Sequence, residues 1–373
     1  MNTSIRRHRR TAAAAVLGTA LTLVLAGCGG DGDSAAEPAG LDPDADLSKQ
    51  TIVVSNWEAY MPDDIADVVK EKTGATVEIT SHATNEDMVA KVTGSGGEGL
   101  DVVFGSQPYL EALARAGMLE PLDTGFLDNW DNLESAAITT AEVDGQPYWA
   151  PYTWGTTGIC YRADLVDEVP TSWYDLLEPS EANQGKVTMM GTERWAMLPA
   201  LKALGYSVNT TDEGELGEAK DLMVAAKPSL LAYDDSTFYE RLISGEATMT
   251  QAWDGWCNYG TAEDENIKFV VPEEGSDLWS DGIAVLKSSE NKEAAYAFID
   301  TILDAKTHAW VEENILYNIP NKAALAEVPA ELTEAYDTLG TRRDEMLSGE
   351  NMTDVGDEAA AIYNQIITEV TAS

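Results

Sequence analysis

Short apolar runs rich in β-branched residues alternate with helical patterns after Thr51, and this alternation limits the folds open to the chain. The first run, Thr51–Val54, is typical of a buried strand, and the helical pattern that follows it closes at Gly74. Asn85 is expected to cap the next helix. The later strand patterns cover Thr76–Thr80, Leu100–Phe104, Lys186–Met190, Ala247–Trp253, Phe269–Pro272 and Gly282–Leu286. Strands that alternate with helices form parallel β/α units, so the sequence predicts an α/β fold.

Aromatic and acidic side chains stand at the ends of several of these strands. The groups are Trp57, Glu58 and Tyr60; Ser106 and Tyr109; Trp253, Asp254 and Trp256; and Trp279 and Asp281. Open α/β sheets bind ligands beyond the carboxyl ends of their strands, so these groups are candidate ligand contacts. Aromatic rings around a carboxylate suit an organic cation, although stacked tryptophans suit sugar rings equally well. Asp254 and Asp281 each precede a glycine and can instead stabilise turns, while Trp57 and Tyr60 can be core residues.

The N-terminus has the pattern of an export signal. Arginines between Arg6 and Arg10 precede the apolar run Ala12–Leu25, which ends in Leu25-Ala26-Gly27-Cys28. This ending resembles the cleavage box of bacterial lipoproteins, in which the cysteine becomes the acylated first residue. A transmembrane anchor is the alternative, but the run is short and lacks a basic stop-transfer patch. The export route, general secretory or twin-arginine, stays open.

The sequence therefore predicts a signal peptide over residues 1–27, lipidation at Cys28 and a disordered tether over residues 28–49. The tether consists largely of Gly, Ala, Ser, Pro and Asp, which cannot form a packed core. We expect an exported protein that is lipid-anchored to the outer face of the cytoplasmic membrane. The body that follows is long enough for two lobes with separate cores.

Composition excludes several classes of function. The formal net charge of −42 repels nucleic acid and attracts cations, although acidity also serves solubility alone. The three histidines have no metal-ligand spacing to one another, which argues against zinc and heme sites. No phosphate-binding loop, Gly-x-Gly-x-x-Gly or Gly-x-Ser-x-Gly motif is present, which argues against nucleotide enzymes and hydrolases. Cys160 and Cys257 are an even pair, and whether they form a disulfide stays open.

Several short motifs occur in an order and spacing that resembles the solute-binding proteins of bacterial polyamine ABC importers, the spermidine/putrescine-binding group. They are Ser55–Tyr60, Pro151–Gly155, Thr171–Trp173, Leu204–Ser207, Glu273–Gly275, Asn318–Asn321 and Asp354–Gly356. The resemblance implies a two-lobed, periplasmic-binding-protein-like α/β fold of type II, with the ligand in the interlobe cleft. It places residues 50–156 and 279–331 in lobe 1, and residues 157–278 and the helical segment 332–373 in lobe 2. The hinge strands would cross near Gly155–Tyr161, Ser276–Ser280 and Ala330.

The same resemblance implies a ligand site. An aromatic box falls on Trp57, Tyr60, Trp253, Trp279 and Tyr317, with Asp281 as the amine-binding aspartate and Ser106 as a polar contact. The family's second acidic cluster corresponds here to Thr192 and Trp195, with Glu193 between them. The predicted ligand-binding residues are therefore Trp57, Glu58, Tyr60, Ser106, Tyr109, Thr192, Glu193, Trp195, Trp253, Asp254, Trp279, Asp281 and Tyr317. A linear polyamine needs carboxylates at both ends, because an unpaired ammonium in a closed cleft is costly.

We expect a monomeric binding protein, not an enzyme, that needs no cofactor or metal. It would capture putrescine, spermidine or a related organic cation and deliver it to the permease of an ABC importer. A shorter diamine, a guanidino compound and a methylated ammonium are all compatible with the sequence. The alternatives are a carbohydrate receptor and an extracellular glycoside hydrolase that uses Glu58, Asp254 and Asp281 as its acids.

Overall fold

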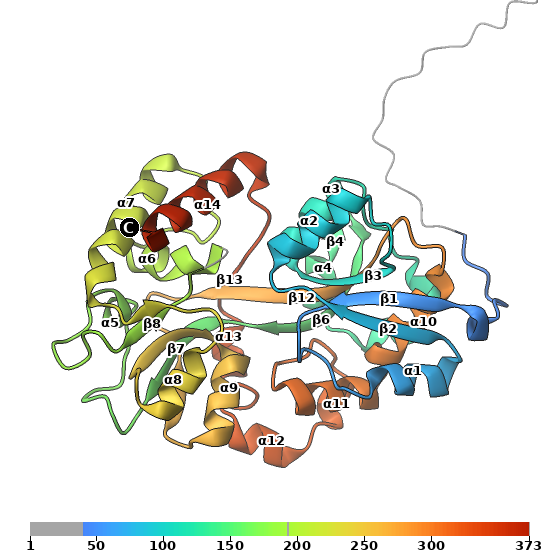
Figure 1. Ribbon diagram of the computed structural model, residues 1–373. Coiled ribbons are helices and arrows are strands. Elements are labelled where there is room, and N and C mark those ends of the chain that lie inside the picture. The colour runs from blue at the N-terminus through green and yellow to red at the C-terminus, as the bar shows by residue number, and fades with distance from the viewer. Residues whose placement is uncertain (1–39, 192–193, 373) are drawn as a thin grey trace, which may run out of the picture. The chain divides into compact units, whose positions relative to one another are not determined.

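The computed structural model describes residues 40–191 and 194–372. The predicted signal peptide and Cys28 lie outside this range, as do Thr192 and Glu193. These described residues form one compact unit, which contains two main β-sheets with helices packed around them (Figure 1). None of the helices in the described residues combines the length and the apolar character that a bilayer crossing requires.

Lobe 1 is built on the larger sheet. Its strands, within the described residues, are β1 (Thr51–Asn56), β2 (Thr76–Ser81), β3 (Val102–Ser106), β6 (Trp149–Gly155), β12 (Asp277–Val285) and β13 (Glu350–Asn351). The order is β13-β12-β3-β1-β2, and β6 also pairs with β12. β1 runs parallel to β2 and β3, whereas β12 is antiparallel to β3 and β6. The helices of this lobe are α1 (Ile65–Thr73), α2 (Asn85–Ser95), α3 (Gln107–Arg115), α4 (Ser135–Thr140), α10 (Lys292–Leu303) and α11 (Ala305–Ile315).

Lobe 2 is built on the second sheet, with the strand order β11-β7-β10-β8-β9. These strands are β7 (Thr157–Arg162), β8 (Val187–Met189), β9 (Ala232–Tyr233), β10 (Met249–Trp253) and β11 (Ile267–Val270). Its helices are α5 (Tyr174–Leu177), α6 (Leu198–Ala203), α7 (Glu213–Ala226), α8 (Phe238–Ser244), α9 (Asp254–Glu263) and α14 (Gly356–Ala372). The apolar face of the C-terminal helix α14 packs in one core with α6 and α7 (Figure 1).

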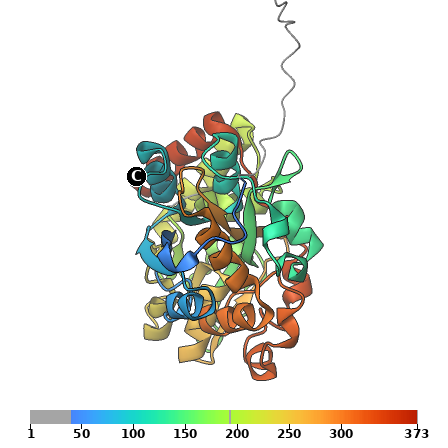
Figure 2. The same ribbon diagram turned by 90° about the vertical axis from the view of Figure 1, so that its right-hand side faces the viewer.

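The remaining elements are short. They are the hairpin β4 (Glu142–Val143) and β5 (Gln146–Pro147), helices α12 (Ala330–Ala335) and α13 (Arg343–Met346), and the 3₁₀ helices η1 (Leu47–Lys49), η2 (Thr124–Phe126), η3 (Trp130–Asn132), η4 (Arg194–Met197), η5 (Lys227–Ser229) and η6 (Ala324–Ala326). In lobe 1, α1 packs against α10, so helices that are far apart in the sequence cover the same sheet (Figures 1 and 2).

The C-terminus of α1 and the N-terminus of α2 can be compared with the helix ends predicted from the sequence. α1 buries Ile65 and Val69 and ends at Gly74, which has a φ of +84° that favours glycine. The helix end predicted at Gly74 is therefore confirmed. The prediction that Asn85 caps α2 is wrong, because the cap is Thr84, whose hydroxyl accepts a 3.1 Å hydrogen bond from the Asp87 amide.

Strand β12 begins earlier than the sequence indicates. The strand predicted from the sequence begins at Gly282, but β12 already begins at Asp277. Gly282 lies instead at a register shift after Asp281, where a Cβ atom would come within 2.1 Å of the Trp149 ring. The glycine makes room for a core tryptophan, so Trp279 and Asp281 are strand residues rather than loop residues.

Two of the chain segments that cross between the lobes are hydrogen-bonded to each other. β6 leads directly into β7 through Thr156, and β12 runs beside them from Asp277. The Thr156 hydroxyl donates to the Asp277 carbonyl at 2.6 Å, and the Thr157 amide donates to the Asp277 carboxylate at 2.8 Å.

The third passage is long and contacts both lobes. The Thr338 hydroxyl donates to Asn258 of α9, whereas Arg343 donates to Glu134 of lobe 1 before the chain reaches β13. The residue boundaries of the two lobes stay a proposal.

Candidate functional site

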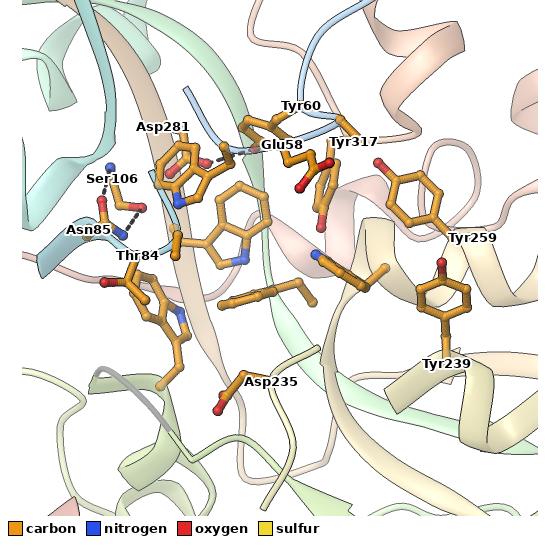
Figure 3. Close-up of a pocket in the computed structure, with 17 residues that line it drawn as sticks. Glu58, Tyr60, Thr84, Asn85, Ser106, Asp235, Tyr239, Tyr259, Asp281 and Tyr317 are labelled. Atoms are coloured by element: carbon orange, nitrogen blue, oxygen red, sulfur yellow. Dashed lines mark hydrogen bonds between the residues drawn. The ribbon is translucent and has the colours of Figure 1, made fainter. Parts of the chain in front are cut away.

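A cavity of about 280 Å³ lies between the two lobes and is lined by side chains from both (Figure 3). The predicted ligand-binding residues that line it are Trp57, Glu58, Tyr60, Ser106, Trp195, Trp253, Trp279, Asp281 and Tyr317. The structure thus brings together residues that lie far apart in the sequence. Their role in binding a ligand stays a prediction.

Other lining residues were not among the predicted ones. They are Ala59, Ala83, Thr84, Asn85, Asp235, Tyr239, Trp256 and Tyr259. Trp256 belongs to a strand-end group that the sequence did indicate, whereas Asp235 follows a strand of only two residues, Ala232–Tyr233, which is too short for a recognisable pattern. Among the described lining residues there is no lysine, arginine or histidine, so the charged groups there are all carboxylates.

Asp281 is the most deeply buried carboxylate of this lining, with 7% of its surface exposed. Its Oδ2 atom accepts a 2.7 Å hydrogen bond from the phenol of Tyr60, which also bonds to the Thr153 hydroxyl at 2.6 Å. Its Oδ1 atom is buried without a hydrogen-bond partner in the part of the chain that the structure describes. Such an orphaned oxygen, at a cavity wall, is a position where a cationic donor would be stabilised.

Burial raises the pKa of Asp281 from its usual value of 3.8 to about 6, against the lowering effect of the nearby Ser106 and Tyr60 hydroxyls. Desolvation disfavours the charged form of the carboxyl group, whereas a cation in the cavity would favour it. A cation bound beside Asp281 would therefore lower the pKa of its carboxyl group again.

The loop after β1 is held in an unusual conformation that presents Tyr60. Ala59 has a φ of +56°, which L-residues rarely adopt. The side chain of Asn56 accepts from the Trp57 amide at 2.9 Å and donates to the Tyr60 carbonyl at 3.3 Å. Tyr152 donates to the same carbonyl at 2.8 Å. These bonds offset the local strain and fix the position of both aromatic rings.

The aromatic residues form a continuous set of edge-to-face contacts. Tyr60 lies 5.4 Å from both Trp57 and Tyr317, measured between ring centroids, and Tyr317 lies 5.5 Å from Trp279. Gly255 makes this packing possible, because a Cβ atom there would come within 2.3 Å of the Tyr317 ring. Ring faces attract cations, and tryptophan does so most strongly.

Trp195 lines the cavity and stands at a position that corresponds to the family's second acidic cluster. Its indole Nε1 donates a 2.7 Å hydrogen bond to Oδ2 of Asp277, a fully buried carboxylate whose pKa is raised by burial. The ring also contacts Trp253 edge to face, at 5.8 Å. Trp195 is therefore a fixed aromatic wall, anchored to the passage between the lobes.

Asp254 and Tyr109, which were also predicted to bind the ligand, are not among the residues that line the cavity. Asp254 is fully buried, and its Oδ1 atom accepts from the Thr156 amide at 3.1 Å, so the carboxylate faces the interlobe passage. The Tyr109 phenol donates to Glu86 at 2.8 Å instead. In both cases the polar group is hydrogen-bonded to a residue outside the cavity lining.

Cys160 of β7 and Cys257 of α9 are joined by a disulfide, with 5.7 Å between their Cα atoms. The bond links the strand that leaves the interlobe passage to the helix that carries Trp256 and Tyr259. Within residues 40–191 and 194–372, no group of three or more histidine, cysteine or acidic side chains is placed to hold a metal ion.

Comparison with known proteins gives consistent matches. Residues 64–337 match the bacterial extracellular solute-binding protein family. The chain is 30% identical to spermidine/putrescine-binding periplasmic protein 1 of Haemophilus influenzae, covering 87% of this chain and 90% of that protein. It is also 30% identical to a putrescine/cadaverine-binding protein of Pseudomonas aeruginosa, over 76% of this chain and 83% of that one.

A solved structure extends the similarity to three dimensions. The spermidine/putrescine ABC transporter substrate-binding protein of Streptococcus pneumoniae superposes with a TM-score of 0.75 at 25% identity. The match covers 87% of this chain and 99% of that one. The predicted two-lobed α/β fold is thereby confirmed.

Proposed function

Because the chain belongs to the family of bacterial extracellular solute-binding proteins, we propose that it captures a polyamine such as putrescine or spermidine for an ABC importer. The relatives that match most of its length are named for binding these amines. The protein would hold the ligand between its lobes and present it to the membrane permease. This role requires binding and release, with no chemical change in the ligand.

The observation that carries the proposal is the buried Asp281 carboxylate in an aromatic cavity without described basic residues. An ammonium group would ion-pair with Asp281, while the ring faces attract the charge and cover the hydrocarbon chain. The unpartnered Oδ1 atom is where such a donor would be received. A neutral ligand would leave this carboxyl group without compensation for its burial.

The direct test is isothermal titration calorimetry of the mature protein with putrescine, spermidine and a panel of oligosaccharides. Asp281→Asn keeps the size of the side chain but removes its charge, and it should weaken amine binding by at least about 100-fold. Asp67→Asn, an exposed change on α1 of the same lobe, is the matched control and should leave the affinity within about twofold. Absence of binding by every amine in the panel would refute the proposal.

A carbohydrate receptor is distinguished in the same experiment. A sugar would bind with similar affinity to the parent protein and to Asp281→Asn, because a neutral amide also hydrogen-bonds hydroxyl groups. Of the three acids that the glycoside hydrolase alternative would use, Asp254 does not line the cavity, whereas Glu58 and Asp281 do, so turnover of a chromogenic glycoside is the test of that alternative.

We also propose that the protein works outside the cytoplasmic membrane as a monomeric lipoprotein. The Haemophilus influenzae relative is named as a periplasmic protein and the Streptococcus pneumoniae one as an ABC transporter substrate-binding protein, and residues 1–28 have the pattern of a lipoprotein signal. Labelling of cells with an alkyne fatty acid should tag the protein, and Cys28→Ala should abolish the tag and release the protein into the soluble fraction. Labelling of the Cys28→Ala variant would contradict the anchor at this position.

A further inference from the structure

Asp277 is the residue at which the three chain segments that cross between the lobes meet. It is the first residue of β12 and so belongs to one crossing segment itself. The hydroxyl of Thr156 donates to its carbonyl and the amide of Thr157 donates to its carboxylate, which joins the segment between β6 and β7 to it. Glu350 of β13 is its partner in the sheet register, and a Cβ atom on Gly349 would collide with the Asp277 carbonyl. Movement of the lobes must bend these segments, so Asp277 lies at the hinge.

The same carboxylate also reaches the wall of the cavity. Its Oδ2 atom accepts a 2.7 Å hydrogen bond from the indole of Trp195, which lines the cavity and is 2% exposed. The backbone carbonyl of Trp195 accepts a 2.6 Å hydrogen bond from the side chain of Gln251 on β10. The main chain of Trp195 is therefore fixed to lobe 2, whereas its ring is fixed to the hinge.

A carboxylate at this position has a chemical reason other than the stability of the fold. Asp277 is fully buried, and the Thr157 amide and the Trp195 indole that donate to its two oxygens are both neutral. Apolar residues of similar volume often stabilise a protein at least as well as a buried charge does. A carboxylate, however, offers two acceptor oxygens to donors from different elements, whereas an amide side chain offers one. The two bonds thus favour a role in joining Trp195 to the crossing segment.

The bond to Asp277 also limits what Trp195 can offer to a ligand. An indole has one N–H donor and no acceptor, and this donor is used by Asp277. The ring contacts Trp253 edge to face, with 5.8 Å between the ring centroids. The ring atoms that line the cavity can cover a hydrocarbon chain or attract a cation, but they cannot donate to a hydroxyl or carbonyl oxygen. This wall therefore selects ligands by apolar surface and positive charge.

We propose that Asp277 is a positioning residue for ligand binding, which fixes the Trp195 ring in the cavity wall and ties this wall to the hinge. The inference rests on the proposed function and refines it. Asp277 does not line the cavity and acts only through Trp195. When the crossing segments have the arrangement of this structure, the indole bond forms and the wall is complete. When they shift, the bond breaks and the ring can turn away, so closure of the lobes and affinity for the ligand depend on the same bond.

The test is a double-mutant cycle, measured by calorimetry with putrescine. Asp277→Asn keeps the size of the side chain but has one acceptor oxygen, so either Thr157 or Trp195 loses its acceptor, and affinity should fall at least about tenfold. Trp195→Phe keeps an aromatic ring without the N–H group. In this background the same Asp277→Asn change should cost less than about twofold. A residue that only stabilised the fold would lose the same factor in both backgrounds.

Asp101→Asn is the matched control for the loss of a buried carboxylate. Asp101 is 8% exposed, accepts a 2.8 Å hydrogen bond from the Val53 amide and does not line the cavity. The control variant should unfold at a lower temperature than the parent protein, but its affinity for putrescine should stay within about twofold.

NMR spectra of protein labelled with ¹⁵N-tryptophan observe the indole bond directly. The signal of the Trp195 indole is assigned by its absence from the Trp195→Phe spectrum, and its hydrogen exchange should be at least about tenfold faster in Asp277→Asn than in the parent protein. Equal loss of affinity in both backgrounds, no loss in Asp277→Asn, or unchanged indole exchange would overturn the inference and leave the proposed function standing. Failure of the parent protein to bind any amine would refute both.

Discussion

The phenol of Tyr60 donates a 2.7 Å hydrogen bond to the carboxylate of Asp281, and this bond joins the loop after β1 to strand β12. Both groups are nearly excluded from solvent, at 9% and 7% exposure. Burial and the negative charge of Asp281 raise the pKa of Tyr60 well above its usual range, so the phenol stays protonated and acts as the donor. The pair positions one carboxylate oxygen and leaves the other for the ligand.

Replacement of Tyr60 by phenylalanine should therefore change the acidity of Asp281 as well as the affinity. The ring is kept, but the carboxylate loses the donor that favours its charged form, so its pKa should rise above about 6. Putrescine binding should weaken by about tenfold at neutral pH, the size expected for a hydrogen bond to a charged group.

A matched control is Tyr259→Phe, which also changes a phenol of the cavity lining. The Tyr259 hydroxyl donates to the Ile315 carbonyl at 2.9 Å, away from Asp281. Loss of this hydroxyl should leave the pH dependence of putrescine binding as it is in the parent protein. Equal midpoints in the curves of affinity against pH for Tyr60→Phe and Tyr259→Phe would contradict the role assigned to Tyr60.

Amine binding should depend on pH through Asp281. The free carboxyl group has a pKa of about 6, and ion pairing with an ammonium lowers the pKa in the complex. Below about pH 6 the protein must release a proton on binding, so the affinity should fall by up to about tenfold per pH unit and level off above about pH 7. Titrations in two buffers of different ionisation enthalpy would report this proton release near pH 6. Constant affinity between about pH 5 and pH 7.5 would argue against the pKa shift.

Glu312 should make the fold less stable as the pH rises from about 5 to about 8. It lies on α11 with 1% exposure, its Oε2 atom has no hydrogen-bond partner among the described residues, and burial raises its pKa from 4.5 to about 8. Between these two values the folded state keeps a proton that the unfolded chain releases, so stability falls as the pH rises.

The variant Glu312→Gln removes this titration. Relative to the variant, the parent protein should lose roughly 3 kcal/mol of unfolding free energy between about pH 5 and pH 8. Urea unfolding at both pH values measures the difference, and removal of the exposed acid in Glu313→Gln provides the control on the same helix. Parallel pH dependence of Glu312→Gln and the parent protein would refute the prediction.

Much of this protein could be derived from local patterns. Strand β1 is a β-branched run, α1 ends at a glycine, and the strand ends carry the aromatic residues that line the cavity. These features depend on near neighbours in the chain, because strand periodicity and helix termination are set within a few residues. The α/β class and the aromatic strand ends of the cavity lining follow from them, whereas the two-lobed arrangement, Tyr317 and Trp195 were predicted from the resemblance to polyamine-binding proteins.

The roles of the acidic residues could not be derived in this way. Asp254 and Asp281 both precede a glycine, yet Asp254 binds the amide of Thr156 and Asp281 lines the cavity. Asp234 and Asp235 are adjacent, yet one pairs with Arg241 and the other lines the cavity. A carboxylate accepts whichever donors the fold brings to it, and those donors come from distant parts of the chain.

The sequence by itself thus determined the α/β class and the aromatic, acidic character of the strand ends. Only the tertiary structure decided which carboxylates line the cavity, that Cys160 pairs with Cys257, and that Trp195 is anchored to Asp277. The physical reason is the distance along the sequence over which each property is set. Helices and strands are selected by local periodicity, whereas burial, hydrogen-bond partners and pKa values depend on contacts that exist only in the folded chain.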